Sequence, residues 1–210
     1  WVDYTPNSYV QIPTGGTTLQ VRTAITNDSG YEGAETFNLI ATNTAGASAT
    51  GVGTIVDDGT GAIYKYSGSS SATPLSPNDA SYPALDDDRT PSVTGTTVNE
   101  ASPYVMFKVS GVEDQKLSLT LAGGTATLGT DTALASSMEY FNGTAWVTYT
   151  GGFITMPNDG NATPGQAASV LVRLAVKPDT LNEGAETLTL TAATTSGAAP
   201  VSLVSVPTVA

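Results

Sequence analysis

The stretch Leu117-Ser118-Leu119-Thr120-Leu121 alternates leucine with a small polar residue, and this period of two runs through the chain. The same alternation recurs at residues 105–109 (VMFKV), 170–176 (VLVRLAV) and 188–191 (LTLT). Successive side chains of a β-strand point to opposite faces, so each stretch predicts a strand with one buried face. No window of a dozen residues carries a helical stripe, and turn residues separate the strands at short intervals. The sequence therefore predicts an all-β fold of antiparallel sandwiches.

The clearest turn in the sequence is Asn142-Gly143. It lies between residues 138–141 (MEYF) and 145–149 (AWVTY), which both have the composition of strands. Asn and Gly tolerate the positive φ angles of a tight hairpin turn. We therefore expect a β-hairpin at this position.

An internal repeat sets the organisation of the chain. Residues 1–5 (WVDYT) recur as residues 146–150 (WVTYT), and residues 32–36 (EGAET) return unchanged as residues 183–187. The first pair is displaced by 145 residues and the second by 151, so six additional residues fall in the Asn-, Gly- and Pro-rich segment 158–168. Surface loops tolerate such insertions. A repeat of this length leaves room for less than two copies in 210 residues.

The repeat divides the chain into three segments. Residues 1–58 form the back half of one sandwich repeat, residues 59–88 a linker with an acidic junction, and residues 89–210 a second, nearly complete repeat. The first copy lacks the strands that residues 98–121 provide in the second, so it should expose backbone edges and apolar faces. We expect neighbouring repeats of the same protein, or adjoining copies of the chain, to complete residues 1–58 by strand complementation. The absence of an initial Met and of a signal segment is expected for a piece of a longer protein.

Composition removes several classes of function. The 210 residues contain 7 Lys and Arg, 19 Asp and Glu, and neither His nor Cys. Catalytic triads built on histidine, zinc sites built on imidazole or thiolate, and disulfide frameworks are therefore excluded. A net charge of −12 repels nucleic acid and anionic lipid, and no apolar run approaches the roughly 20 residues of a membrane span. We expect no nucleic-acid partner, no membrane insertion and no enzymatic activity, and divalent cations are the natural counter-charge.

The acidic residues gather at turns. The pair Asp57-Asp58 and the triplet Asp86-Asp87-Asp88 flank the linker, and Arg89 is the one cation next to them in the sequence. Adjacent carboxylates repel each other unless a cation lies between them. Calcium accepts six to eight oxygen ligands in flexible geometry, so it suits carboxylates that come from several loops. The two clusters therefore predict a Ca²⁺ site at the junction.

Three motifs follow one another in the second copy: residues 98–100 (VNE), residues 124–131 (GTATLGTD), and Asp179 followed by residues 183–187 (EGAET). Their order resembles that of a Calx-beta-like repeat, the immunoglobulin-like module of large bacterial adhesins exported by type I secretion. Residues 53–58 (GTIVDD) supply the closing motif of the first copy. The resemblance implies tandem immunoglobulin-like β-sandwiches that bind calcium at one end, in an extracellular protein of the bacterial cell surface.

The resemblance also implies a set of calcium ligands. In the second copy they are Glu100, Asp131, Asp179 and Glu183, and in the first copy Asp28, Glu32, Asp57 and Asp58. The alternative interpretation of Glu183 is a solvated turn residue, and that of Glu100 a surface charge at a strand end. No Asp-Asp pair closes the second copy, so its site is expected to be incomplete within these residues.

These features predict a structural function. The first hypothesis is a calcium-stiffened extender or stalk repeat of a large extracellular bacterial adhesin or surface fibre, with a role in cell adhesion. The alternative is a subunit of a self-assembling extracellular filament or surface layer. A second alternative is a glycan- or protein-binding module that uses the long loops at residues 63–83 and 158–168.

Overall fold

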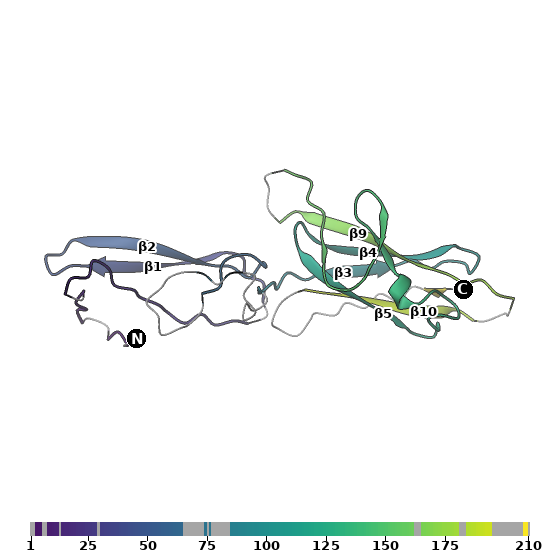
Figure 1. The fold of residues 1–210 in the computed structure, drawn as a ribbon, viewed down its shortest axis with the longest axis horizontal. Coiled ribbons are helices and arrows are strands. Elements are labelled where there is room, and N and C mark those ends of the chain that lie inside the picture. The colour runs from purple at the N-terminus through teal and green to yellow at the C-terminus, as the bar shows by residue number, and fades with distance from the viewer. Residues whose placement is uncertain are drawn as a thin grey trace.

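The computed structural model describes residues 3–5, 8–12, 14–28, 30–64, 74, 76, 85–161, 165–180 and 184–194, and the backbone of residues 208–209. Every strand pair in these residues is antiparallel, and the helical content is a single turn of 3-10 helix, Ala135–Ser137. The all-β, antiparallel class predicted from the alternating sequence is therefore confirmed. Figure 1 shows an elongated molecule, with two strands in one part and the remaining strands in the other. Most of the predicted linker lies outside the described residues.

The first part contains a hairpin made of β1 (Glu35–Thr42) and β2 (Ser48–Ile55). Its turn is closed by Asn43, whose backbone and side chain both make hydrogen bonds across the turn. The ring of Phe37 lies over Gly53 on the facing strand, where a Cβ atom would come within 2.6 Å of the ring. Glycine is therefore required opposite this aromatic side chain. The described residues before β1 form no strand.

The second part contains two sheets. One has the order β3 (Ser92–Gly95), β4 (Tyr104–Val112), β9 (Ala167–Ala175), β6 (Glu139–Phe141) and β7 (Trp146–Thr148). The other has the order β11 (Thr208–Val209), β10 (Glu186–Ala193), β5 (Lys116–Gly123) and β8 (Ile154–Thr155). β4 and β5 follow each other in the chain but belong to different sheets, so the chain crosses from one sheet to the other at residues 113–115 (Figure 1).

The two sheets share one hydrophobic core. In the first sheet Phe107 of β4 lies opposite Val172 of β9, and in the second Leu190 of β10 lies opposite Leu121 of β5. The period of two in the sequence decides which side chains face inward. The buried members of these four strands are Val105, Phe107, Val109, Leu117, Leu119, Leu121, Val170, Val172, Leu174, Leu188, Leu190 and Ala192.

The predicted hairpin at Asn142-Gly143 is confirmed, because β6 and β7 pair on either side of it. The geometry of its turn differs from the expectation that both residues suit positive φ. Gly143 has a φ of 93°, but Asn142 does not have a positive φ. Asp114 is the only residue other than glycine with positive φ in the described chain. Asn142 instead closes the turn with its side chain. Its Oδ1 atom accepts hydrogen bonds from the backbone N–H groups of Thr144 and Ala145.

The internal repeat is visible in the strands. β1 and β10 begin and end at equivalent positions, because both bounds are displaced by 151 residues. The burial of equivalent side chains nevertheless differs: Leu39 of β1 is 49% exposed, whereas Leu190 of β10 is 0% exposed. β10 lies between β5 and β11, whereas β1 has β2 alone beside it in the described structure. The same residue pattern therefore forms a core only where partner strands are present.

The substitution Leu190→Ala should destabilise the protein by about 2–5 kcal/mol, because it leaves a cavity in a closed core. The equivalent substitution Leu39→Ala should change the free energy of unfolding by only about 0.5 kcal/mol, as for an exposed site. Urea denaturation of both variants measures the difference. Equal losses of stability at the two positions would contradict the finding that Leu39 is exposed whereas Leu190 is buried.

Candidate functional site

The two acidic clusters that flank the predicted linker lie side by side. Asp58 and Asp87 form an isolated antiparallel bridge. Two backbone hydrogen bonds flank this bridge, from Gly59 N–H to the Asp86 carbonyl (2.6 Å) and from Asp88 N–H to the Asp57 carbonyl (2.9 Å). The two ends of the predicted linker therefore meet at the junction of the two parts of the molecule.

The open end of the β1–β2 hairpin brings further carboxylates to this junction. In an antiparallel pair the start of one strand lies beside the end of the other, so the loop before β1 meets the residues after β2. The Glu32 N–H donates to Asp57 Oδ2 over 2.8 Å, and the Gly30 N–H donates to Asp28 Oδ1 over 2.8 Å. Glu35 is the first residue of β1 and lies at the same end.

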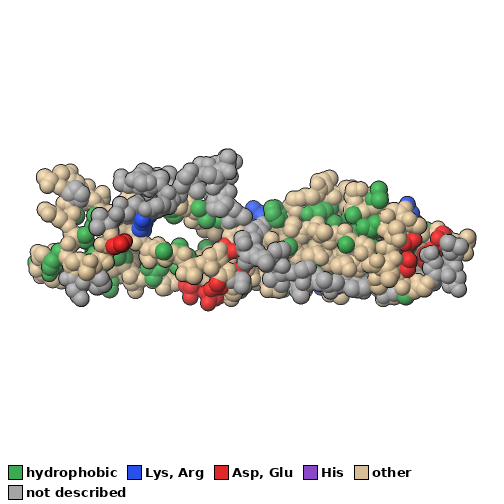
Figure 2. All heavy atoms as spheres, turned by 90° about the horizontal axis from the view of Figure 1, so that it is seen from below, with side chains coloured by type: hydrophobic (Ala, Val, Ile, Leu, Met, Phe, Trp, Pro, Cys, Tyr) green, Lys and Arg blue, Asp and Glu red, His purple; other side chains and the backbone are tan. Residues whose placement is uncertain are grey.

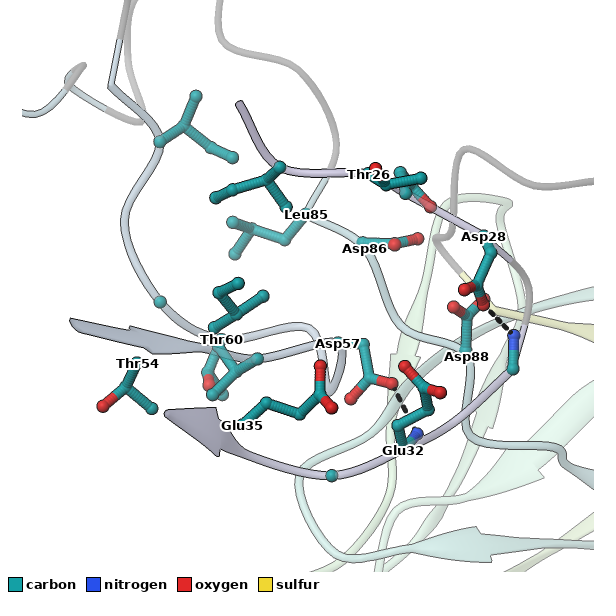
Figure 3. A pocket seen from close by; sticks show the side chains of 18 of the residues that line it. Thr26, Asp28, Glu32, Glu35, Thr54, Asp57, Thr60, Leu85, Asp86 and Asp88 are labelled. Atoms are coloured by element: carbon teal, nitrogen blue, oxygen red, sulfur yellow. Dashed lines mark hydrogen bonds between the residues drawn. The ribbon is translucent and has the colours of Figure 1, made fainter. Parts of the chain in front are cut away.

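Six carboxylates line a cavity of about 520 Å³ at this corner. They are Asp28, Glu32, Glu35, Asp57, Asp86 and Asp88, which we call the acidic corner. Figure 3 shows their side chains reaching the cavity from three segments: the loop before β1 with the first residue of β1, the residues after β2 and the residues before β3. Neither lysine nor arginine is among the described lining residues. The structure thus brings together five of the predicted ligands, which are all members of the acidic corner except Glu35.

Mutual repulsion within the acidic corner shifts the pKa of two of its members. The carboxylate of Glu35, followed by that of Asp28, raises the pKa of Glu32 above its ordinary value. The pKa of Asp88 is raised first by burial and then by neighbouring carboxylates, of which Asp86 has the largest effect. Both groups bind a proton more readily than an isolated carboxylate does. The corner is therefore stabilised by any positive charge that enters it.

Two oxygens of the acidic corner are buried without a hydrogen-bond partner in the described part of the chain. They are Oδ1 of Asp57 and Oδ1 of Asp86, which belong to the two acidic clusters at the two ends of the predicted linker. Burial of a carboxylate oxygen is costly when nothing compensates its charge. Calcium binds to oxygen ligands of this kind, so these residues suit a calcium ion by the chemistry of their ligand atoms.

The acidic corner is not a preformed metal site. Within the described ranges, no group of three or more acidic side chains has the arrangement needed to hold an ion. The cavity of about 520 Å³ is much larger than a single ion, since even a water molecule occupies about 30 Å³ in the liquid. The carboxylates therefore line the space instead of meeting at one point. A bound ion would either draw them inward or complete its ligand shell with water.

The sequence also predicts Asp87 and Asp58 as ligands, and the structure places both outside the lining of the cavity. Asp87 is 1% exposed, and Arg89 binds its two carboxylate oxygens through Nε and Nη2, each at 2.8 Å. Asp58 accepts hydrogen bonds from the backbone and the hydroxyl of Thr60. A metal role for Asp87 would require the buried ion pair with Arg89 to open.

The predicted ligands of the second copy lie at the far end of the second part. Glu100 Oε1 accepts a hydrogen bond from the Asp179 N–H over 2.8 Å, and the Lys177 N–H donates to the Asp131 carbonyl over 2.8 Å. The segments that carry these three carboxylates therefore meet, and Figure 2 shows acidic side chains gathered at this end as well as near the junction. Glu183 lies outside the described residues.

Two residues of the junction were not predicted from the sequence. Glu35 lines the cavity, and its place in the repeated EGAET motif is the signal that could have found it. Gln115 is 0% exposed, and its side chain donates to the Arg89 carbonyl over 2.6 Å and accepts from the Val112 N–H. Gln115 therefore fixes the backbone beside the Asp87 ion pair, a role for which the sequence carries no signal.

Comparison with known proteins adds no family assignment. No family model matches the chain, and a search of curated proteins finds no significant match. The Calx-beta-like resemblance thus stays a prediction that rests on the residues quoted above. Among the described residues no helix is both long and apolar enough to cross a bilayer.

Because Glu32 and Asp88 have raised pKa values, their ionised forms destabilise the folded junction. This penalty is present at neutral pH and disappears as the pH falls through the raised values toward the ordinary carboxylate range of about 4. In chelator and low salt, the variant Glu32→Gln/Asp88→Asn should melt at a higher temperature than the parent at pH 7, and the gap should close on acidification. Thermal melting across this pH range is the measurement. The exposed-site variant Asp3→Asn is the control, and an equal gain there would refute the explanation.

The substitution Arg89→Met should destabilise the protein by roughly 3 kcal/mol, because it leaves the buried Asp87 carboxylate without its partner. The double variant Arg89→Met/Asp87→Asn should recover most of this loss, since the remaining buried group is neutral. Urea denaturation checks both expectations, with the exposed Lys116→Met as the control for loss of a positive charge. Failure of the second substitution to restore stability would show that packing, not charge, is the function of Arg89.

Proposed function

We propose that the chain is a calcium-stiffened extender repeat of a large extracellular adhesin or surface fibre of a bacterium. Its role is structural, and it is not an enzyme. The observation that carries the proposal is the pair of buried oxygens on Asp57 and Asp86 that have no hydrogen-bond partner among the described residues, set among four further carboxylates. A cation in the acidic corner would compensate the negative charges of Asp57 and Asp86, which lie at the two ends of the predicted linker.

The position of the acidic corner explains why a cation would stiffen the molecule. Asp28, Glu32 and Asp57 belong to the first part, whereas Asp86 and Asp88 lie on the segment that leads into β3 of the second part. Calcium supplies a hard divalent charge with six to eight positions for oxygen ligands. Without a cation the carboxylates repel one another across the junction, which favours relative motion of the two parts. With a cation the same groups become a link between them.

The wider assignment follows from the same features. Two antiparallel sheets around one core in the second part, together with the repeat, support tandem immunoglobulin-like sandwiches of the Calx-beta-like kind. The chain has 19 acidic and 7 basic residues and lacks His and Cys, which suits calcium-rich surroundings outside the cell. Glu100, Asp131 and Asp179 would form the corresponding site at the next junction, with Glu183 as a further candidate.

Calcium should raise the melting temperature of the chain, and excess EDTA should reverse the rise. At a calcium concentration one hundred times the dissociation constant, linkage contributes about 2.7 kcal/mol to stability. Replacement of Asp57 and Asp86 together by Asn should abolish most of the calcium-dependent shift, whereas Asp3→Asn should leave it intact. An unchanged melting temperature in EDTA would remove the calcium proposal.

Calcium should also narrow the range of distances between the two parts. Because the chain contains no cysteine, spin labels can be attached specifically at Ala45→Cys in the β1–β2 turn and Thr144→Cys in the β6–β7 turn. Pulsed electron paramagnetic resonance should give a broad distance distribution in EDTA and a narrow one in calcium. A distribution of the same width in both conditions would exclude a stiffening role even if calcium binds.

A subunit of a self-assembling surface filament is the second candidate function. The observation that favours it is the apolar surface of the first part, where Val21, Ile25, Phe37 and Leu39 are each more than two-fifths exposed. Exposed apolar patches of this kind mark interaction surfaces.

A further inference from the structure

One position of the repeat carries a different charge in the two copies. The displacement of 151 residues pairs Thr26 with Lys177, and it pairs Asp28, two residues later, with Asp179. Thr26 and Asp28 both line the cavity of the acidic corner (Figure 3). Neither lysine nor arginine is among the described residues that line this cavity. The second copy therefore has an ammonium group at the position where the first copy has a neutral hydroxyl.

Lys177 holds the loop that carries Asp131, one of the predicted calcium ligands of the second copy. Its backbone N–H donates to the Asp131 carbonyl over 2.8 Å, and its Nζ donates to the Gly129 carbonyl over 2.5 Å. The carboxylate of Asp131 is turned back onto the same loop, because its Oδ2 accepts a hydrogen bond from the Thr127 N–H. The positive charge of Lys177 is therefore fixed to the loop that carries this carboxylate.

The chain around Lys177 also meets the other predicted ligands of this copy. Asp179, two residues after Lys177, donates its backbone N–H to Glu100 Oε1 over 2.8 Å. The segment of Lys177 therefore contacts both the loop that carries Asp131 and the segment that carries Glu100. Figure 2 shows basic and acidic side chains together at this end of the molecule.

The ammonium group of Lys177 binds an atom of the kind that calcium binds. Calcium takes its ligands from carboxylates and backbone carbonyls, and Lys177 is hydrogen-bonded to a backbone carbonyl, that of Gly129. A nearby positive charge stabilises the ionised form of a carboxylate. Because the lysine is part of the chain, its charge is present at any calcium concentration. The second copy therefore contains a partial substitute for a bound cation.

We propose that Lys177 is a tethered counter-ion, which lets the carboxylates of the second copy stay together without calcium. The inference rests on the proposed function for its contrast: the acidic corner, with Thr26 at the equivalent position, takes its cation from solution. The two ends of one unit then differ in their need for calcium. Lys177 is the residue that sets this difference.

Reciprocal substitutions in the full chain test this role, in EDTA and low salt. Lys177→Gln removes the charge but keeps an N–H donor for the Gly129 carbonyl, and it should lower the melting temperature by about 1–3 °C. Thr26→Lys should raise the melting temperature by a similar amount, because it adds a positive charge to six carboxylates, whereas the neutral Thr26→Gln should not. The control is Lys108→Gln, since Lys108 is exposed and lies opposite uncharged residues of β3 and β9.

Salt and calcium separate charge from packing. The difference between Lys177→Gln and the parent should shrink in about 1 M NaCl, where the Debye length is about 3 Å, whereas a packing role would leave it unchanged. In isothermal titration calorimetry, Thr26→Lys should bind calcium at least tenfold more weakly than Thr26→Gln does, because the lysine competes for the same carboxylates.

Three results would overturn the inference: a loss for Lys177→Gln no larger than that for Lys108→Gln, a loss that salt leaves unchanged, or equal melting temperatures of Thr26→Lys and Thr26→Gln in EDTA. A parent chain that takes up no calcium would contradict the proposed function instead. The measurements in EDTA would still decide the role of Lys177, because they involve no calcium.

Discussion

The short backbone pairing between residues 57–59 and 86–88 is the constraint on which the junction depends. Hydrogen bonds of 2.6 and 2.9 Å on either side of the Asp58–Asp87 bridge hold two acidic segments in contact, although they lie far apart in the sequence. Such bonds are directional and short in range, so they fix the positions of the carboxylates that the same residues carry. Arg89 compensates Asp87, and the six carboxylates of the acidic corner have no comparable partner among the residues lining the cavity.

The two parts of the molecule show how the surroundings of a sequence determine its burial. β1 and β10 share their place in the repeat and their alternating pattern. The apolar side chains of β1 are nevertheless exposed, whereas those of β10 are buried. The difference lies in the neighbouring strands, since a sheet face becomes a core only when a second layer covers it. The first part therefore has an exposed apolar face and, separate from it, a corner lined by carboxylates.

The strands and turns that could be predicted were those determined by the order of residues within a short segment. The strands around Leu119 and Val172 followed from alternation, and the hairpin at Gly143 followed from turn composition. The repeat and the acidic clusters were also evident, and five of the eleven predicted ligands meet at one corner. The pairing of Asp87 with Arg89, and its separation from the cavity, could not be predicted, because adjacent carboxylates in a sequence point in different directions once the backbone pairs.

The sequence by itself determined the all-β class, the two-residue period of the core and the recurrence of the EGAET motif 151 residues later. These properties depend on side-chain type and spacing along one strand, which are local. The tertiary structure decided which carboxylates share a cavity, which oxygens lack partners and which copies of the same apolar pattern are covered. These properties depend on strands far apart in the chain, because pairing partners and packing layers are chosen by the whole fold and not by any one segment.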